Sequence, residues 1–172
     1  MKTAINNNEL KIEYLKNPKV ALEKIYDAYA DQMIQYAVHS LRLTPEQAED
    51  AVHQAFLPWV KEHEKMTQVE NIRAYLYTTL RHACFRVRNQ RVDFSLDPEL
   101  EAMPGKDAEL SEDIDSALIK LNQDQREVVF LKIWSDLSFE EIAELQNVPL
   151  QTAASRYRYA IAKLKEILKW NQ

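Results

Sequence analysis

The sequence has almost no glycine and little proline. Its 172 residues include one Gly, six Pro and one Cys. Gly and Pro are the residues least compatible with helix interiors, so their scarcity favours a mostly helical chain. The lone Cys excludes an internal disulfide framework. No apolar run approaches the roughly 18 residues of a membrane span, and the first residues are polar throughout, so we expect no membrane insertion, no signal peptide and a cytoplasmic protein.

Signatures of catalysis and metal binding are also absent. With one glycine, a glycine-rich phosphate-binding loop is not available. The histidines and the cysteine do not have the spacing of metal ligands; these residues are His39, His53, His63, His82 and Cys84. No nucleophile motif occurs either. The sequence therefore predicts a protein that is not an enzyme and that has no metal and no cofactor.

The charge of the chain is strongly segregated, although its sum is only −5. Between Asn71 and Val92 there are five arginines and no acid. Between Asp93 and Asp115 nine acids stand against one lysine, and between Gln151 and Lys169 five cations stand against one glutamate. Two basic elements are thus separated by an acidic strip, a distribution that suits a nucleic-acid partner better than the net charge does.

The acidic strip also contains two of the prolines and the only glycine, which is typical of a linker. Its charge could keep it away from DNA, and a plain solvated spacer explains it equally well. We predict an all-α fold of two small helical domains, residues 1–92 and 113–172, joined by an acidic flexible linker at 93–112. The second domain is predicted to contain a helix-turn-helix.

Three or four helices are predicted in the first domain, and three of them can be placed from apolar residues at three- and four-residue spacing. One begins at Asn17 and Pro18, and a second, capped by Thr44, begins at Pro45 and should be kinked or near its end at Pro58. A third runs from Ile72 to about Asn89. The residues predicted to face inward are Leu22, Ile25, Tyr29, Met33, Ala37 and Leu41, then Ala48, Val52, Phe56 and either Trp59 or Val60, then Ile72, Tyr75, Leu76, Thr79, Leu80 and Ala83.

The second domain is predicted to contain helices near 114–121 and at 123–133, followed by a helix-turn-helix at 138–168. Ser138 and Glu141 have the spacing of a reciprocal capping box, so a helix should begin at Phe139. Asn147 tolerates the left-handed conformation and Pro149 disfavours helix at the residue before it. We therefore expect a turn at this point and a second helix from about Leu150.

The start of this last helix has the chemistry of a DNA reader. Ala153, Tyr157, Ala160, Ile161, Leu164 and Leu168 form its predicted inner stripe. The groups predicted to face outward near its start are Gln151, Thr152, Ser155, Arg156 and Tyr159. Such side chains can reach base edges and phosphates in the major groove. The alternative at this point is an ordinary helical hairpin whose cations are merely solvated.

Three motifs in fixed order then indicate a family. They are AEDAVHQAFLPWV, NIRAYLYTTLRHACFRVRNQR and the long segment from LNQDQREVVF to RYAIAKL. From about residue 21 to 168, interrupted only by the linker, the chain resembles the small two-domain bacterial sigma factors of the extracytoplasmic-function group, within the sigma-70 family. The resemblance implies that the first domain binds the clamp of core RNA polymerase and melts the −10 element, while the second reads the −35 element.

The resemblance also implies site residues. In the segment that resembles the polymerase-binding helix, the exposed candidates are Asp50, His53, Gln54 and Leu57. In the segment that resembles the promoter-melting helix, the candidates for DNA contact are Arg81, His82, Arg86, Arg88 and Arg91. In the segment that resembles the −35 reading helix, they are Gln151, Thr152, Ser155, Arg156 and Arg158. The chain departs from the family pattern at His53 and Gln54, at Pro58, at His82, at Gln151 and at Ala154. These departures affect the polymerase contact and the preferred DNA sequence.

The expected partners are core RNA polymerase and promoter DNA, with an anti-sigma factor as a further candidate. Two other functions are compatible with the same residues. One is a free-standing regulator that uses the helix-turn-helix on a two-fold symmetric site, with the first domain as an effector or dimerisation module. The other is a polymerase-binding module that has lost DNA reading, which the departures at His82, Gln151 and Ala154 suggest.

Overall fold

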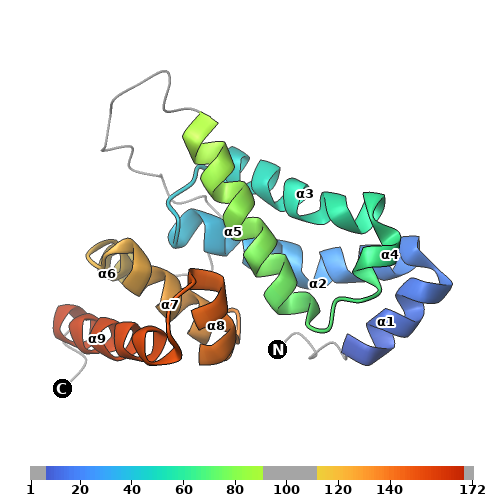
Figure 1. Ribbon diagram of the computed structural model, residues 1–172. Coiled ribbons are helices and arrows are strands. Elements are labelled where there is room, and N and C mark those ends of the chain that lie inside the picture. Colours follow the sequence, from blue (N-terminus) through green and yellow to red (C-terminus); the bar gives the residue numbers. More distant parts are fainter. Residues whose placement is uncertain (1–6, 91–111, 169–172) are drawn as a thin grey trace. The chain divides into compact units, whose positions relative to one another are not determined.

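The computed structural model describes residues 7–90 and 112–168, and within them every regular element is an α-helix (Figure 1). The helices are α1 (Asn7–Lys16), α2 (Pro18–His39), α3 (Pro45–Lys61), α4 (His63–Met66), α5 (Ile72–Gln90), α6 (Glu112–Ile119), α7 (Gln123–Ile133), α8 (Phe139–Gln146) and α9 (Leu150–Leu168). The predicted all-α fold is confirmed. Among these described helices, none is long and apolar enough to cross a membrane.

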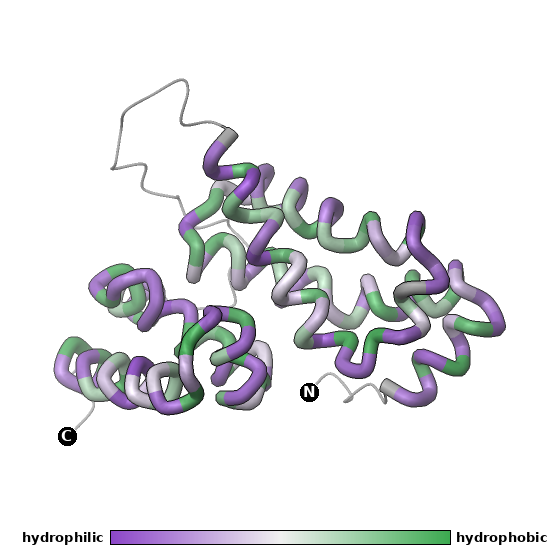
Figure 2. The backbone as a smooth tube through the Cα atoms, viewed as in Figure 1, coloured by the Kyte–Doolittle hydropathy of each residue, from purple (hydrophilic) through white to green (hydrophobic). Residues whose placement is uncertain are grey.

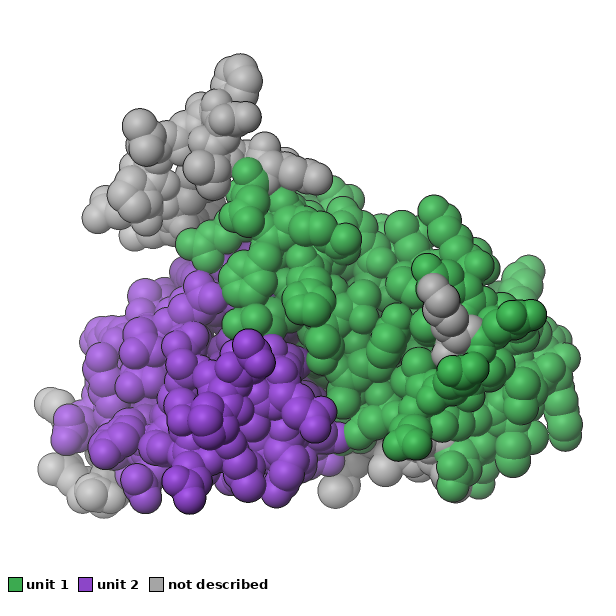
Figure 3. Space-filling view, in the orientation of Figure 1, with its two compact units in different colours: residues 1–34, 46–96 green, residues 35–45, 97–172 purple. Residues whose placement is uncertain are grey.

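The chain packs as two compact units (Figure 3). Unit 1 comprises residues 1–34 and 46–96, and unit 2 comprises residues 35–45 and 97–172. The division therefore falls inside α2, whose last turn packs with the C-terminal helices. Most of the predicted linker, residues 93–111, lies outside the described residues, and Glu112 already begins α6.

Unit 1 is held together by an aromatic junction that joins α1 to α3, α4 and α5. The Tyr14 hydroxyl donates to the Trp59 carbonyl oxygen at 2.5 Å, and the two rings meet edge to face with centroids 5.5 Å apart. The Tyr75 ring also meets Trp59 edge to face, with ring centroids 5.8 Å apart, and the centroid of the His63 ring lies 4.7 Å from that of Tyr14. Burial raises the pKa of Tyr14, which keeps the hydroxyl protonated as a donor.

The structure decides which of Trp59 and Val60 belongs to the inward-facing stripe of α3. Trp59 is 3% exposed and Val60 is 66% exposed, so Trp59 is the core residue of the two candidates. Phe56 is also buried. Pro58 lies inside α3, in its last turn, as expected for a residue that removes a backbone donor near a helix end.

The other predicted stripes of unit 1 are largely confirmed. Along α5, Leu76, Leu80 and Ala83 are buried, whereas Tyr75 and Thr79 are half-buried at the edge of the stripe. Hydrophilic and hydrophobic residues alternate along these helices, as an amphipathic pattern requires (Figure 2).

Unit 2 includes residues 35–45 because their polar groups are bonded to α6 and α7. His39, 1% exposed, places Nδ1 2.6 Å from Asp115 Oδ1 on α6. The Tyr36 hydroxyl donates to the carboxylate of Glu127, which is fully buried on α7. Arg126 donates from Nε to the Ser40 carbonyl oxygen at 2.9 Å. These contacts were not anticipated from the sequence, because nothing local pairs residues so far apart in the chain.

A hydrophobic cluster in the core of unit 2 forms where α6, α7 and α9 meet. The buried residues of this cluster are Ala117, Leu118, Leu121, Val129, Ala160 and Leu164. Tyr157, Ile161 and Leu168 pack against this cluster while remaining partly exposed, so the predicted inner stripe of α9 is found where it was expected. Helix α7 begins as predicted after Asn122, whose side chain accepts from the Gln125 amide at 2.9 Å.

The turn between α8 and α9 follows the local signals of the sequence. Ser138 Oγ accepts from the Glu141 amide at 3.2 Å, and the Ser138 amide donates to Glu141 Oε2 at 2.6 Å, which completes the capping box. Asn147 is left-handed, with φ 54° and ψ 52°. The Val148 amide donates back to the Ala143 carbonyl oxygen at 2.9 Å, as in a Schellman motif. A short, fixed turn thus sets the start of α9.

Candidate polymerase and nucleic-acid interfaces

The outward face of α3 carries the four residues predicted to bind polymerase. Asp50 and His53 are exposed and Gln54 is half-buried. Leu57 is 45% exposed. These side chains therefore share a solvent-facing surface rather than the core.

One neighbour of this surface was not predicted as part of the site. Val60 lies one turn beyond Leu57 and is the more exposed of the two. At the other end, the His53 ring stacks on Tyr26 of α2, with Nε2 3.4 Å from the tyrosine hydroxyl. The surface therefore combines an apolar end with a polar end that a second helix supports.

The predicted promoter-melting helix is α5, and its cations differ in exposure. His82, Arg86 and Arg88 are exposed, whereas Arg81 is half-buried. Arg91 lies outside the described residues. Because no acid occurs from Asn71 to the end of this helix, its exposed face is cationic and suits a phosphate backbone.

The aromatic residues of α5 are mostly unavailable for stacking on bases. Tyr77 is fully buried, and Tyr75 packs against Trp59, as the sequence suggested. Phe85 is half-buried, and the Arg81 guanidinium lies over its ring at 4.7 Å. A base that stacked on Phe85 would therefore have to share that ring with a cation.

At the start of α9, most of the residues predicted to read DNA face solvent. Gln151 and Arg158 are exposed, and Thr152 and Ser155 are half-buried. The Ser155 hydroxyl donates to the Gln151 carbonyl oxygen, so one of its hydrogen-bonding directions is already used. Residues at 151, 155 and 158 lie on the same face of a helix, which is the geometry of a groove-reading surface.

Tyr159 extends this exposed face. Its side chain is 62% exposed, and the Arg158 guanidinium lies 5.5 Å from its ring. An exposed aromatic ring with a cation over it can contact a thymine methyl or a sugar as well as a phosphate.

Arg156 is placed differently from the other candidates. Its Nη1 donates to Gln146 Oε1 at 2.9 Å and its Nη2 lies 2.7 Å from Asp124 Oδ2. The guanidinium is therefore bonded to the end of α8 and to the first turn of α7. Neither Gln146 nor Asp124 was identified from the sequence, since helical periodicity indicates the face of a residue but not its partner.

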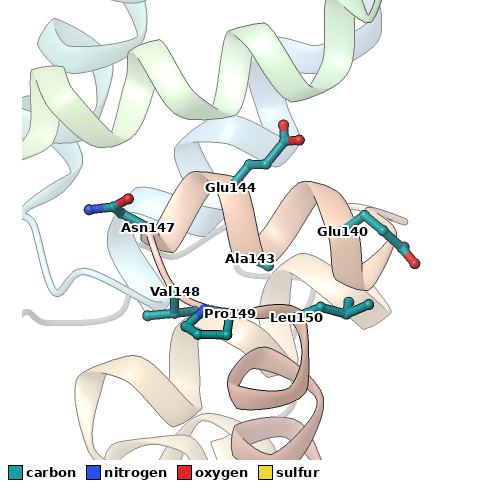
Figure 4. A pocket seen from close by; sticks show the side chains of 7 residues that line it. All are labelled: Glu140, Ala143, Glu144, Asn147, Val148, Pro149 and Leu150. Atoms are coloured by element: carbon teal, nitrogen blue, oxygen red, sulfur yellow. The ribbon is translucent and has the colours of Figure 1, made fainter.

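A hollow with two exposed glutamates lies beside the turn of the helix-turn-helix. It is lined by Glu140, Ala143, Glu144, Asn147, Val148, Pro149 and Leu150 (Figure 4). In the close-up, Glu140 and Glu144 project from α8, while Val148, Pro149 and Leu150 follow the turn into α9. Both carboxylates would repel phosphates, so DNA is expected on the face of α9 that carries Arg158.

The described residues offer no grouping for a metal. In the part of the chain that the structure describes, no three His, Cys, Asp or Glu side chains come together as ion ligands. Cys84 is buried on α5.

Comparison with known proteins agrees with this arrangement. Residues 25–92 match the family model for sigma-70 region 2, and residues 111–164 match that for sigma-70 region 4. The extracytoplasmic-function (ECF) RNA polymerase sigma factor EcfG of Rhodopseudomonas palustris (strain TIE-1) is 32% identical over 136 residues, which cover 75% of each chain. The ECF RNA polymerase sigma factor SigW of Bacillus subtilis (strain 168) is 27% identical over 173 residues, covering 90% of this chain and 92% of the relative.

Two solved structures share the fold. The sigma factor RpoE, in its complex with the anti-sigma factor NepR from Bartonella quintana, matches with a TM-score of 0.68 and 24% identity, covering 93% of this chain and 99% of the other. CnrH, in complex with the cytosolic domain of CnrY, matches with a TM-score of 0.64 and 18% identity, covering 95% of this chain and 97% of the other. With the family models and the EcfG match, these findings show that the chain belongs to the extracytoplasmic-function RNA polymerase sigma factors of the sigma-70 family.

Proposed function

We propose that three helix faces divide the work of this sigma factor. The face of α3 docks on core RNA polymerase, the cationic face of α5 binds and melts the −10 element, and the exposed start of α9 reads the −35 element. The observation that carries the proposal is the presence of a basic helix and a capped helix-turn-helix on either side of an acidic segment. The protein would act through binding alone, in the cytoplasm and without a cofactor.

The physical basis of this division is that each DNA contact is small. Few cations are available on either α5 or α9, so each contact alone should be weak and sensitive to salt. Docking on polymerase supplies affinity and positioning, and the two DNA contacts supply specificity. This explains how a chain with a net charge of −5 can act on DNA.

Run-off transcription tests the proposal as a whole. Purified core polymerase is incubated with the full chain and fragmented genomic DNA, and promoter-dependent transcripts are measured together with core binding. We expect initiation at a defined set of promoters only when the chain is present. If there is neither initiation nor binding to core polymerase, the proposal is wrong.

Two exposed leucines test the docking surface. Replacing Leu57 by Ser removes an apolar side chain from the proposed contact and should weaken core binding about tenfold, since central apolar contacts in interfaces are worth 1 kcal/mol or more. Leu15 on α1 is 62% exposed and lies on a different helix. The Leu15→Ser variant serves as the matched control and should bind core polymerase as the wild type does.

The α5 surface is tested through the salt dependence of open-complex formation. Replacing Arg86 by Ala removes one exposed cation, and the slope of log affinity against log salt should fall by about 0.7 for a single-stranded contact. Lys19 is an exposed cation on α2 and provides the control, with no change expected in the slope. An unchanged slope in the Arg86 variant would exclude a phosphate contact at that position.

We also propose that an anti-sigma protein binds this chain. The support is that the structurally similar RpoE was solved in complex with the anti-sigma factor NepR. Co-purification of the full chain from its own cells, followed by identification of proteins bound in stoichiometric amounts, tests this. A partner that blocks binding to core polymerase in vitro is the expected result.

A further inference from the structure

A continuous chain of hydrogen bonds runs through unit 2 and ends on the DNA-reading helix. The Arg156 guanidinium bonds to Gln146 Oε1 through Nη1 at 2.9 Å and to Asp124 Oδ2 through Nη2 at 2.7 Å. Asp124 is in the first turn of α7 and Gln146 is the last residue of α8. One side chain of α9 is therefore bonded to two of the helices that pack against it, α7 and α8.

Gln146 is itself fixed by buried groups. Gln146 is only 7% exposed. Its Nε2 donates to Glu127 Oε2 at 2.9 Å and to the Asp124 carbonyl oxygen at 3.3 Å. Glu127 is fully buried and accepts a further hydrogen bond from Tyr36. The anchor for Arg156 is thus part of the interior of unit 2 and not a mobile surface group.

The donors and acceptors leave the Gln146 amide one favourable orientation. Its NH₂ group faces a carboxylate and its oxygen faces a guanidinium. Turning the amide over would point NH₂ at the cation and oxygen at the anion, both of which are repulsive. The planar fork of Arg156 presents Nη1 to Gln146 and Nη2 to Asp124 in a fixed geometry, which the single rotatable ammonium group of a lysine does not provide.

Only three residues separate α8 from α9, so the angle between these helices depends on the turn and on side-chain contacts such as this one. Two N–H groups of the Arg156 guanidinium are bonded to α8 and α7, which holds the side chain against these helices. Arg158, two positions further on, is exposed and faces the reading surface. The two arginines therefore have different tasks.

We propose that Arg156 is a positioning residue: through Gln146 and Asp124 it fixes how α9 is presented to the −35 element, and it does not contact DNA. This inference rests on the proposed promoter reading by α9. Sequence discrimination is then carried by the exposed face of the helix, with Gln151, Ser155 and Arg158 as its members.

Asp124 provides the sharpest test, because the two possible roles of Arg156 predict opposite effects. If Arg156 positions α9, removing Asp124 loosens the helix and reduces discrimination between −35 sequences. If Arg156 binds phosphate, removing Asp124 releases a cation toward DNA and increases affinity and salt dependence. The Asp124 side chain is 46% exposed, so its ion pair alone adds little to stability, and the Asp124→Ala variant should fold.

The experiment uses holoenzyme assembled from core polymerase and the full chain, on a promoter with single-base changes in its −35 element. The variants are Arg156→Ala, Asp124→Ala, the double substitution, and Arg158→Ala as the control on the same helix. Affinity is measured over a range of salt, at a temperature where far-ultraviolet circular dichroism shows every variant folded. Wild type should prefer the correct base by about 5- to 150-fold at each read position.

We expect Arg156→Ala and Asp124→Ala each to reduce this preference about 3- to 10-fold, with the salt slope unchanged, and the double variant to be no worse than either single one. Arg158→Ala should lower the slope by about 1. A slope lowered by about 1 in Arg156→Ala, or tighter binding in Asp124→Ala, overturns the inference. The inference is also overturned if Arg156→Ala lowers the unfolding temperature but leaves the preference between −35 sequences unchanged. Failure of the proposed function is seen separately, as a wild-type holoenzyme with no −35 preference.

Discussion

Replacing Asp115 by Asn removes the charge of the carboxylate that joins α6 to the end of α2. In unit 2, Asp115 Oδ1 lies 2.6 Å from His39 Nδ1, and the two side chains are 11% and 1% exposed. His39 is held from its other side, where Nε2 lies 2.9 Å from Gln35 Oε1. Arg42 is a more distant partner of Asp115, at 3.8 Å. Asn has the size of Asp, so the substitution changes charge with little change in packing.

The expected cost follows from the burial of the pair. Removing one partner of a buried ion pair costs about 3 to 5 kcal/mol, but Asn keeps an oxygen that can accept from His39. A charged hydrogen bond exceeds a neutral one by about 1 kcal/mol, and the cations near Asp115 lose their counter-charge. We therefore expect Asp115→Asn to lower the free energy of unfolding by about 2 kcal/mol. Asp113→Asn, an exposed change on the same helix, should cost only a few tenths.

The effect should depend on pH with a defined sign. The hydrogen bond from His39 lowers the pKa of Asp115; burial opposes this, and the charges of His39, Arg42 and Arg126 reinforce it. A carboxyl whose pKa is lower in the folded state stabilises the fold above its unfolded pKa of about 3.9, and that stability is lost as pH falls through the folded pKa. The difference in stability between wild type and Asp115→Asn should therefore narrow below about pH 4.

Trp134 provides a local readout of this change. Its ring stacks on Phe130 at 5.1 Å, and Phe130 in turn stacks on His39 at 6.4 Å. Urea unfolding followed by fluorescence, in a background where the other two tryptophans are replaced by Phe, reports on this part of unit 2. The assigned pairing of Asp115 with His39 is refuted if Asp115→Asn lowers the free energy of unfolding no more than Asp113→Asn does. It is also refuted if the difference in free energy of unfolding between wild type and Asp115→Asn stays constant down to pH 3.

Three further substitutions test the local structure. Ser138→Ala removes the acceptor of the capping box and should cost about 1 kcal/mol in urea unfolding, with Ser138→Thr close to wild type. Tyr14→Phe removes the donor to the Trp59 carbonyl oxygen and should cost about 1 to 2 kcal/mol. Because burial raises the pKa of Tyr14, wild type should also lose stability as pH rises above about 10, and a Tyr14→Phe variant with the same alkaline loss would contradict this. Leu118→Ala should lower the free energy of unfolding by about 2 to 5 kcal/mol, measured by calorimetry. A loss below about 1 kcal/mol would show that Leu118 is not packed in the core.

The parts of the fold that local chemistry determines could be predicted from the sequence. Ser138 and Glu141 define the start of α8, Asn147 defines its end, and Asn122 defines the start of α7, because each acts through a hydrogen bond or a backbone conformation within a few residues. The face of Trp59 was ambiguous, since Trp59 and Val60 fit the same helical period.

Long-range contacts could not be predicted in this way. His39 and Asp115 are 76 positions apart, and no periodic pattern relates them. Helix α1 was missed because Leu10 and Tyr14 are its buried apolar residues and its stability depends on the contact with Trp59. Arg156 was placed on a DNA-facing surface by periodicity and family pattern, and only three-dimensional packing revealed its bonds to Asp124 and Gln146.

The position of residues 35–45 has a consequence for dissecting the protein. These residues lie within the match to sigma-70 region 2, which spans 25–92, yet they pack in unit 2, which contains the match to region 4. A fragment cut in the acidic segment would deprive Glu127 of the Tyr36 hydroxyl and Asp115 of His39. Each buried polar group left without its partner costs about 1 to 3 kcal/mol. In this protein the region 2 family match and the compact packing unit therefore have different boundaries, and a C-terminal fragment needs residues 35–45 to keep these buried partners.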